Sequence, residues 1–177
     1  HPVARVVTLS IIVLLAGLAM VAATEQPFEA LMPAPWWVFV MCAVLWALSE
    51  VFVYHVEHRS EVMCISWSDL PTMLALAFLS PVAAVTLWTA SSFTALQLQR
   101  PQKPYKAFFN LTLFVFEASL TVFIVRLVVE PGDVEVWRFL LAATIAIYVN
   151  GIAGTALVEC AISCFEGDPR RHLLSGI

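Results

Sequence analysis

The chain has 177 residues, of which 61% are hydrophobic and 12% are charged, and its mean hydropathy is +0.89. Soluble domains are about 45–50% apolar and about 25% charged, so the composition excludes most soluble enzymes and disordered regions. Nine Lys and Arg residues against thirteen Asp and Glu residues also exclude the basic surface that nucleic-acid binding requires. The composition predicts a domain that lies in a lipid bilayer.

The first apolar stretch predicts a membrane-spanning helix over about 5–23. Its 18 uncharged residues at 6–23 exceed the core of a signal peptide, which has about 7–15. The chain begins at His1 and has a polar stretch near its end. We therefore expect a membrane domain over 1–165, excised from a longer protein, with 166–177 as the linker to a cytoplasmic output domain.

The second helix is predicted over 36–55. Trp36 and Trp37 open it, as aromatic residues do at a membrane interface, and Glu50 is its only charged residue. The connector 55–67 is too polar to cross a membrane alone, and we expect part of it to be extended.

Residues 70–99 carry no charge and form either one long kinked helix or two segments. Asp69 is a natural N-cap for a short segment over 69–79. A proline breaks or kinks a helix, so Pro81 favours a separate segment over 82–98.

Two more helices complete the chain. The first is predicted over 105–129, and a Glu-Pro-Gly-Asp turn at 130–133 separates it from the second, which is predicted over 136–165. Each has the roughly 20 predominantly apolar residues that a spanning helix needs.

The basic residues decide between five and six segments, because short cytoplasmic loops carry an excess of Lys and Arg. With a turn before Pro81, only Arg126 and Arg138 lie near one side of the membrane. The other seven share the opposite side, and they are Arg5, Arg59, Arg100, Lys103, Lys106, Arg170 and Arg171. The sequence therefore predicts an all-α, polytopic membrane helix bundle of six segments with both termini cytoplasmic. The segment over 69–79 is too short to span at about 1.5 Å per residue, so we expect it to enter to partial depth.

Ionisable groups inside a membrane are costly and are candidate functional groups. Glu117 lies seven residues after Asn110, so the two side chains share nearly one helix face. With Asp69 they are predicted to line one cavity for a small or lipophilic ligand, with Trp88 as a further contact. The alternatives are a protonated Glu117 that only holds helices together, Asp69 as a cap, and Trp88 as a core or lipid-facing aromatic residue.

Other polar residues have ordinary explanations. His55 and His58 are potential metal ligands, but their spacing matches no zinc signature, so no metal site is predicted. Asn150 and Glu159 are interpreted as packing or interface groups. The chain has no glycine-rich phosphate loop, no GxSxG motif and no HExxH motif. We therefore expect this segment to have no catalytic residues of its own and to require no cofactor.

Two stretches of the chain resemble a known family. They are Ile65-Ser-Trp-Ser-Asp-Leu-Pro-Thr-Met-Leu-Ala-Leu-Ala-Phe-Leu-Ser-Pro81 and Lys106-Ala-Phe-Phe-Asn-Leu-Thr-Leu-Phe114. Together they resemble the N-terminal multi-pass membrane sensor regions of bacterial, largely actinobacterial, signalling proteins with cytoplasmic GGDEF or EAL domains. The usual pattern there is Ser-Leu-Ser-Glu/Asp-Ile/Leu-Pro, an apolar run ending in Ser-Pro, and Lys-x-x-Phe-Asn-Leu. Here Trp67 replaces the usual Leu, and Asp69 takes the acidic position.

The resemblance covers about 55–165 and implies a sensory domain of the bacterial inner membrane. Such a domain regulates a cytoplasmic domain in cyclic-di-GMP turnover, so the full-length protein is expected to be a diguanylate cyclase, a phosphodiesterase or both. A second copy of the chain is a further expected partner. The helix order also resembles the substrate-binding subunits of energy-coupling-factor transporters, which implies vitamin-type uptake as the alternative. A third interpretation is a pure membrane anchor and dimeriser.

Overall fold

The computed structural model describes residues 2–24, 29–51, 54–58, 61–65, 68–99, 101–130 and 135–166. Within these ranges the chain forms six helices and one β-hairpin, which lies between the second and third helices. The predicted helical bundle is therefore confirmed, and the hairpin agrees with the expectation that part of the connector 55–67 is extended. The predicted linker lies outside the described residues from residue 167 onward.

The helices are α1 (Pro2–Ala23), α2 (Trp36–Val51), α3 (Asp69–Phe78), α4 (Pro81–Gln99), α5 (Pro104–Arg126) and α6 (Val136–Glu166), and the strands are β1 (Tyr54–His58) and β2 (Glu61–Ile65). The strands pair antiparallel, with Tyr54 opposite Ile65 and His58 opposite Glu61. The sequence predicts helix as far as residue 55, but α2 ends at Val51. The reason is that Tyr54, Val56, Val62 and Ile65 lie in the two strands, and these residue types favour strands.

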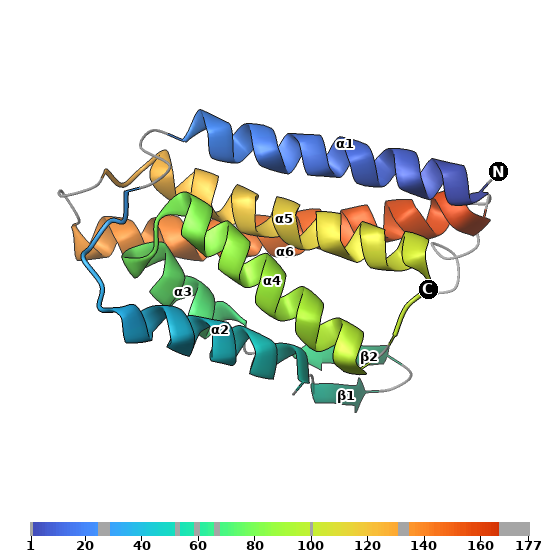
Figure 1. Ribbon diagram of the computed structural model, residues 1–177, viewed down its shortest axis with the longest axis horizontal. Coiled ribbons are helices and arrows are strands. Elements are labelled where there is room, and N and C mark those ends of the chain that lie inside the picture. The colour runs from blue at the N-terminus through green and yellow to red at the C-terminus, as the bar shows by residue number, and fades with distance from the viewer. Residues whose placement is uncertain are drawn as a thin grey trace.

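The predicted break at Ser80-Pro81 is confirmed as a turn between two helices. Leu79 is extended after α3, with φ −104° and ψ 149°, and Ser80 Oγ accepts a hydrogen bond from the Ala83 N–H at 3.3 Å. Proline suits the first helical position because it has no N–H to leave unpaired. The chain therefore reverses between α3 and α4 (Figure 1).

The start of α3 differs from the prediction by one residue. Asp69 is the first residue of the helix and not its N-cap. Ser68 holds the N-cap position, in a helical conformation and with no side-chain capping hydrogen bond. The Asp69 carboxylate is therefore free of the capping role that the sequence suggests for it.

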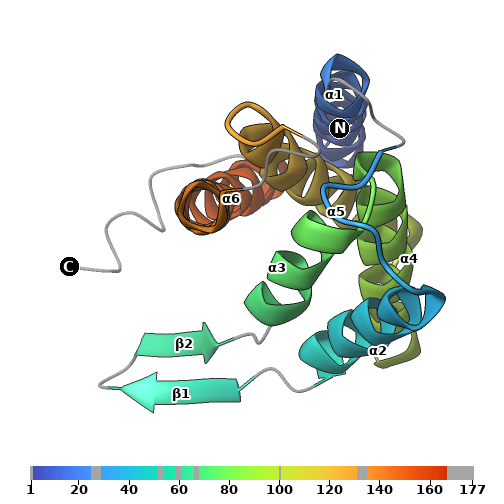
Figure 2. The same ribbon diagram turned by 90° about the vertical axis from the view of Figure 1, so that its left-hand side faces the viewer.

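The helices form a row with two helices on one side of it. In the end view of Figure 2, α1, α5, α4 and α2 follow one another, and α6 and α3 lie on the same side of that row. Trp46 of α2 is fully buried at the centre. Its ring stacks on Trp88 of α4 with centroids 5.4 Å apart, and its indole N–H donates to Thr72 Oγ1 of α3 at 3.3 Å. These contacts hold α2, α3 and α4 together.

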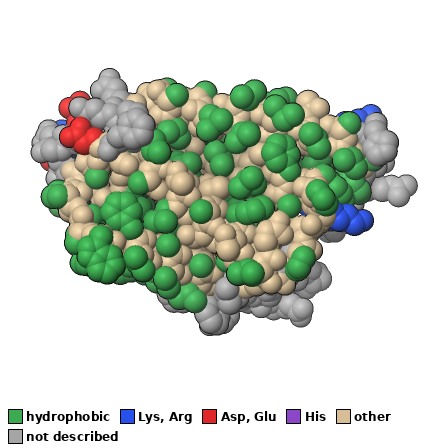
Figure 3. Space-filling model, viewed as in Figure 1, with side chains coloured by type: hydrophobic (Ala, Val, Ile, Leu, Met, Phe, Trp, Pro, Cys, Tyr) green, Lys and Arg blue, Asp and Glu red, His purple; other side chains and the backbone are tan. Residues whose placement is uncertain are grey.

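Three helices, α1, α5 and α6, are long and apolar enough to cross a membrane, judged over the described residues. Their outer faces expose large apolar side chains, such as Leu15 at 60% and Ile152 at 71%. On the face shown in Figure 3, apolar side chains spread over the bundle, with Lys and Arg at one end and Asp and Glu at the other. An apolar surface this extensive is compatible with contact with lipid.

Candidate functional site

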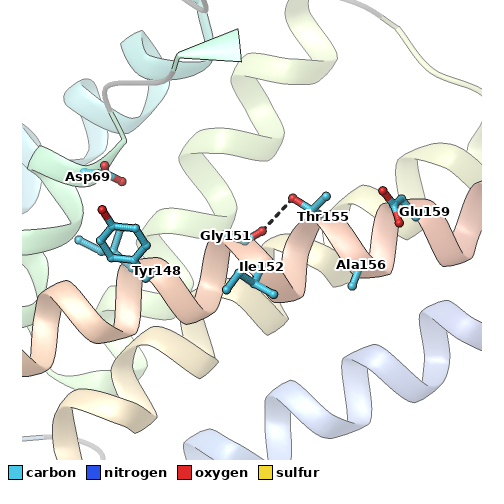
Figure 4. A pocket seen from close by; sticks show the side chains of 8 residues that line it. Asp69, Tyr148, Gly151, Ile152, Thr155, Ala156 and Glu159 are labelled. Atoms are coloured by element: carbon cyan, nitrogen blue, oxygen red, sulfur yellow. Dashed lines mark hydrogen bonds between the residues drawn. The ribbon is translucent and has the colours of Figure 1, made fainter. Parts of the chain in front are cut away.

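A hollow of about 740 Å³ lies between the start of α3 and the outer face of α6. Asp69 lines it from α3, and Tyr148, Gly151, Thr155 and Glu159 line it from α6. In Figure 4 the Tyr148 hydroxyl points toward the Asp69 carboxylate, while Glu159 lies at the far end of the row. Small-molecule sites commonly have volumes of about 300–1,000 Å³, so the hollow has the size of a ligand site.

A second polar group lies on α2, α4 and α5, with α4 packed between the other two. Glu50, near the end of α2, has the Ser92 hydroxyl of α4 as its side-chain hydrogen-bond partner. Glu117 on α5 lies within electrostatic range of Glu50. Glu50 and Glu117 are both partly buried, and we call their two carboxyl groups the carboxyl pair.

Helix α6 packs directly on the Glu117 side of the carboxyl pair. A Cβ atom added at Gly154 would collide with Glu117 Oε1 and would lie 3.4 Å from Glu117 Cδ. A Cβ atom added at Gly151 would meet nothing within 4 Å. The two glycines therefore serve different faces, because Gly154 makes room for Glu117 while Gly151 borders the hollow.

The structure places the four predicted ligand contacts in different parts of the molecule. Asp69 borders the hollow, Glu117 belongs to the carboxyl pair, and Trp88 is in the core with 8% of its surface exposed. Asn110 donates from Nδ2 to Gln102 Oε1 at 2.7 Å and borders a smaller hollow of about 350 Å³ between α5 and α6. Seven residues of helix separate Asn110 from Glu117 by two turns, about 10 Å, so a shared face does not bring them to one level.

Glu50 is the functional candidate that sequence reasoning missed as a partner of Glu117. The sequence did contain a signal for this, because Glu50 and Glu117 are each the only acidic residue in a long apolar stretch. Ionisable side chains inside membrane segments face the bundle interior and commonly meet one another. What the sequence does not show is which of these residues lie at the same depth.

His55 and His58 lie in β1, where the side chains fall outside the structural description. Their backbone is extended, so their three-residue spacing does not correspond to one face of a helix. Among the side chains that are described, no three or more His, Cys, Asp or Glu residues gather where they could hold a metal ion.

No protein-family model, no curated protein and no solved structure matches the chain.

Proposed function

We propose that this chain is a multi-pass sensory domain of the bacterial inner membrane, in which a small or lipophilic ligand acts on α6 and thereby regulates a cytoplasmic signalling domain. The observation that carries the proposal is the position of α6. One face of this helix contacts Glu117 at Gly154, and another face lines the hollow opposite Asp69. A ligand at either place would change the surroundings of the same helix.

The length of α6 supports its role in transmission. It has 31 residues and is therefore about 46 Å long, whereas the hydrocarbon core of a bilayer is about 30 Å thick. A helix of this length contacts both candidate sites and still extends beyond the bilayer. It is suited to carry a rotation or a shift from the membrane to a cytoplasmic domain.

The proposal places both termini and the loop between α4 and α5 in the cytoplasm, with α3 entering to partial depth. The starts of α1 and α5 and the end of α6 lie at the same end of the bundle (Figure 1). Arg5, Lys103 and Lys106 belong to that end, whereas Arg126 and Arg138 belong to the opposite end. Positive charge concentrates on the cytoplasmic side of membrane proteins, which supports this orientation.

The resemblance described above adds the nature of the output, namely cyclic-di-GMP turnover by GGDEF or EAL domains. The test uses the full-length protein, with one, two, three or four alanines inserted after Gly167. Each inserted residue rotates the following domain by about 100° on a continuous helix, so nucleotide turnover should vary with the number inserted. Four residues make nearly a full turn and should perturb turnover least. Unchanged turnover across all four insertions would contradict transmission by α6.

A substrate-binding subunit of a vitamin-type transporter is the second candidate function. The hollow favours it, because about 740 Å³ accommodates a vitamin-sized molecule. Mass spectrometry of small molecules that copurify with the chain, together with the gene sequence, separates the two functions. A copurified vitamin and a gene that ends without an output domain support the transporter subunit. A gene that continues into a GGDEF or EAL domain supports the sensor.

A further inference from the structure

The smaller hollow, of about 350 Å³, is lined by three helices, α1, α5 and α6, which pack against one another in pairs. Val6, Phe109 and Ala161 form its floor, one from each helix, and are 4%, 7% and 8% exposed. Val158 and Ile162 of α6 also line it and are exposed. The hollow therefore has apolar walls and opens on the outer surface of the bundle.

A basic group lies beside these apolar walls. Lys106 is exposed, and it is the one charged residue among those that line the hollow. Arg5, which directly precedes Val6, is exposed as well. Among the described side chains neither of these two cations forms an ion pair, since the pair found there joins Arg138 to Glu135. The hollow therefore combines an apolar interior with positive charge that is free to meet an anion.

The depth of the hollow matches the boundary between head groups and acyl chains. Helix α5 has 23 residues and is about 34 Å long, close to the hydrocarbon thickness of about 30 Å. Lys106 lies in its first turn, whereas Phe109 and, on α6, Val158 lie further from this end of the bundle. A lysine near a helix end reaches the head groups, so its charge and the apolar walls follow the polarity of a lipid.

We propose that this hollow binds an anionic phospholipid of the surrounding membrane, with the phosphate at Lys106 and part of one acyl chain against Phe109, Val158 and Ile162. Basic pockets between membrane helices commonly bind anionic lipid head groups. A volume of about 350 Å³ is at the lower end for ligand sites, so the rest of the lipid lies in the bilayer. A free phosphate ion would leave the apolar walls without a partner.

This inference goes beyond the proposed function and shares with it only the placement of the chain in a membrane. It concerns a hollow other than the one beside Asp69 and requires no output domain. A lipid in this position would contact the ends of α1, α5 and α6 together. Because binding to the folded state raises stability, the lipid should hold these three helix ends against unfolding.

The experiment measures thermal unfolding of the purified 1–177 chain in an uncharged detergent, at fixed pH and ionic strength. Phosphatidylglycerol, phosphatidylcholine with the same acyl chains, and sodium phosphate are titrated in separate series. We expect phosphatidylglycerol to give a saturable rise in Tm of about 5 °C or more at about 100 times its midpoint concentration. The other two series should give less than half of that rise. Native mass spectrometry should show one retained phosphatidylglycerol molecule per chain.

Variants with the same charge change test the role of Lys106. Lys106→Gln removes the charge that faces the hollow, so the phosphatidylglycerol midpoint should rise at least about fivefold. Lys103→Gln removes an exposed charge at the same end of α5 but outside the hollow, and the midpoint should change less than twofold. General attraction between a basic surface and an anionic lipid would instead weaken equally in both variants.

A second pair of variants tests the apolar walls. Ile162→Trp places a larger side chain on the rim and should displace the acyl chain, so the saturable rise should be lost. Ile145→Trp makes the same change on α6 outside the hollow and should keep the rise, since the two isoleucines are similarly exposed, at 43% and 47%.

Four results would overturn the proposal. They are equal shifts with phosphatidylglycerol and phosphatidylcholine, an equal shift with sodium phosphate, equal losses in Lys106→Gln and Lys103→Gln, and an unchanged shift in Ile162→Trp. None of these results bears on the insertion series, which tests transmission by α6. Conversely, a failed insertion series leaves lipid binding standing.

Discussion

Residue by residue, α6 has an inner and an outer side that its two glycines distinguish. Both occur in the same apolar run, and the sequence suggests only that each permits close approach of another helix. In the structure Gly154 faces the Glu117 carboxyl group, and Gly151 has open space beside it. The same residue type therefore has a steric role at one position and none within the chain at the other.

We expect Gly154→Ala to destabilise the protein by about 1–3 kcal/mol, because its Cβ displaces the Glu117 side chain from a packed site. Gly151→Ala should be neutral or stabilising by up to about 1 kcal/mol, since alanine favours helix and the new Cβ meets nothing. The measurement is the free energy of unfolding of both variants in the same detergent.

A double variant checks the cause of that difference. Glu117→Ala removes the atoms with which the new Cβ would collide, so adding Gly154→Ala to it should cost much less than adding it to the unaltered chain. Equal costs in the two backgrounds would show that the Gly154 penalty does not come from Glu117.

At the scale of the elements, hydrogen bonds on both sides hold the turn between α3 and α4. Ser80 begins α4 by accepting a hydrogen bond from the Ala83 N–H. A backbone hydrogen bond from the Met32 N–H to the Ala77 carbonyl at 3.0 Å satisfies one of the free groups at the end of α3. Both ends of the turn are thus stabilised by polar contacts within the chain.

Ser80→Ala removes this cap and should cost about 1 kcal/mol, as loss of an N-cap does elsewhere. Ser91→Ala, the same change inside α4, should cost nothing or be slightly stabilising, because alanine favours helix. Chemical denaturation of the two variants gives the comparison. Equal stabilities would indicate that Pro81 and packing define the turn without help from the Ser80 hydroxyl.

At the scale of the whole molecule, the proposed arrangement of the helices predicts which side of the membrane each loop faces, and this can be measured. Lys103 precedes α5 and Glu130 follows it, and both side chains are exposed. In a background without the four native cysteines, Lys103→Cys and Glu130→Cys should react from opposite sides of the membrane with an impermeant thiol reagent. Only Glu130→Cys should react in intact spheroplasts, and Lys103→Cys should react after permeabilisation. Labelling of both from outside would contradict cytoplasmic placement of the loop between α4 and α5.

Much of the fold follows from local features of the chain. Predominantly apolar runs of helical length mark α1, α5 and α6, and Ser80-Pro81 marks the boundary between α3 and α4. The hairpin was less visible, because the connector 55–67 was expected to be extended only in part. A short strand pair depends on the partner strand as much as on its own residues, so its pairing could not be deduced from either half.

The amino-acid sequence by itself determined a helical, lipid-compatible chain and located its costly polar residues, because both depend only on composition and on where apolar runs begin and end. Tertiary structure alone decided that Glu117 lies against Gly154, that Asn110 bonds to Gln102, and that Asp69 faces α6. The physical reason is that membrane helices are apolar on every side, since lipid and protein neighbours are both apolar. Their periodicity therefore does not show which face turns inward. That choice is made by the packing of all six helices together, through close contacts such as Gly154 against Glu117 and Trp46 against Trp88.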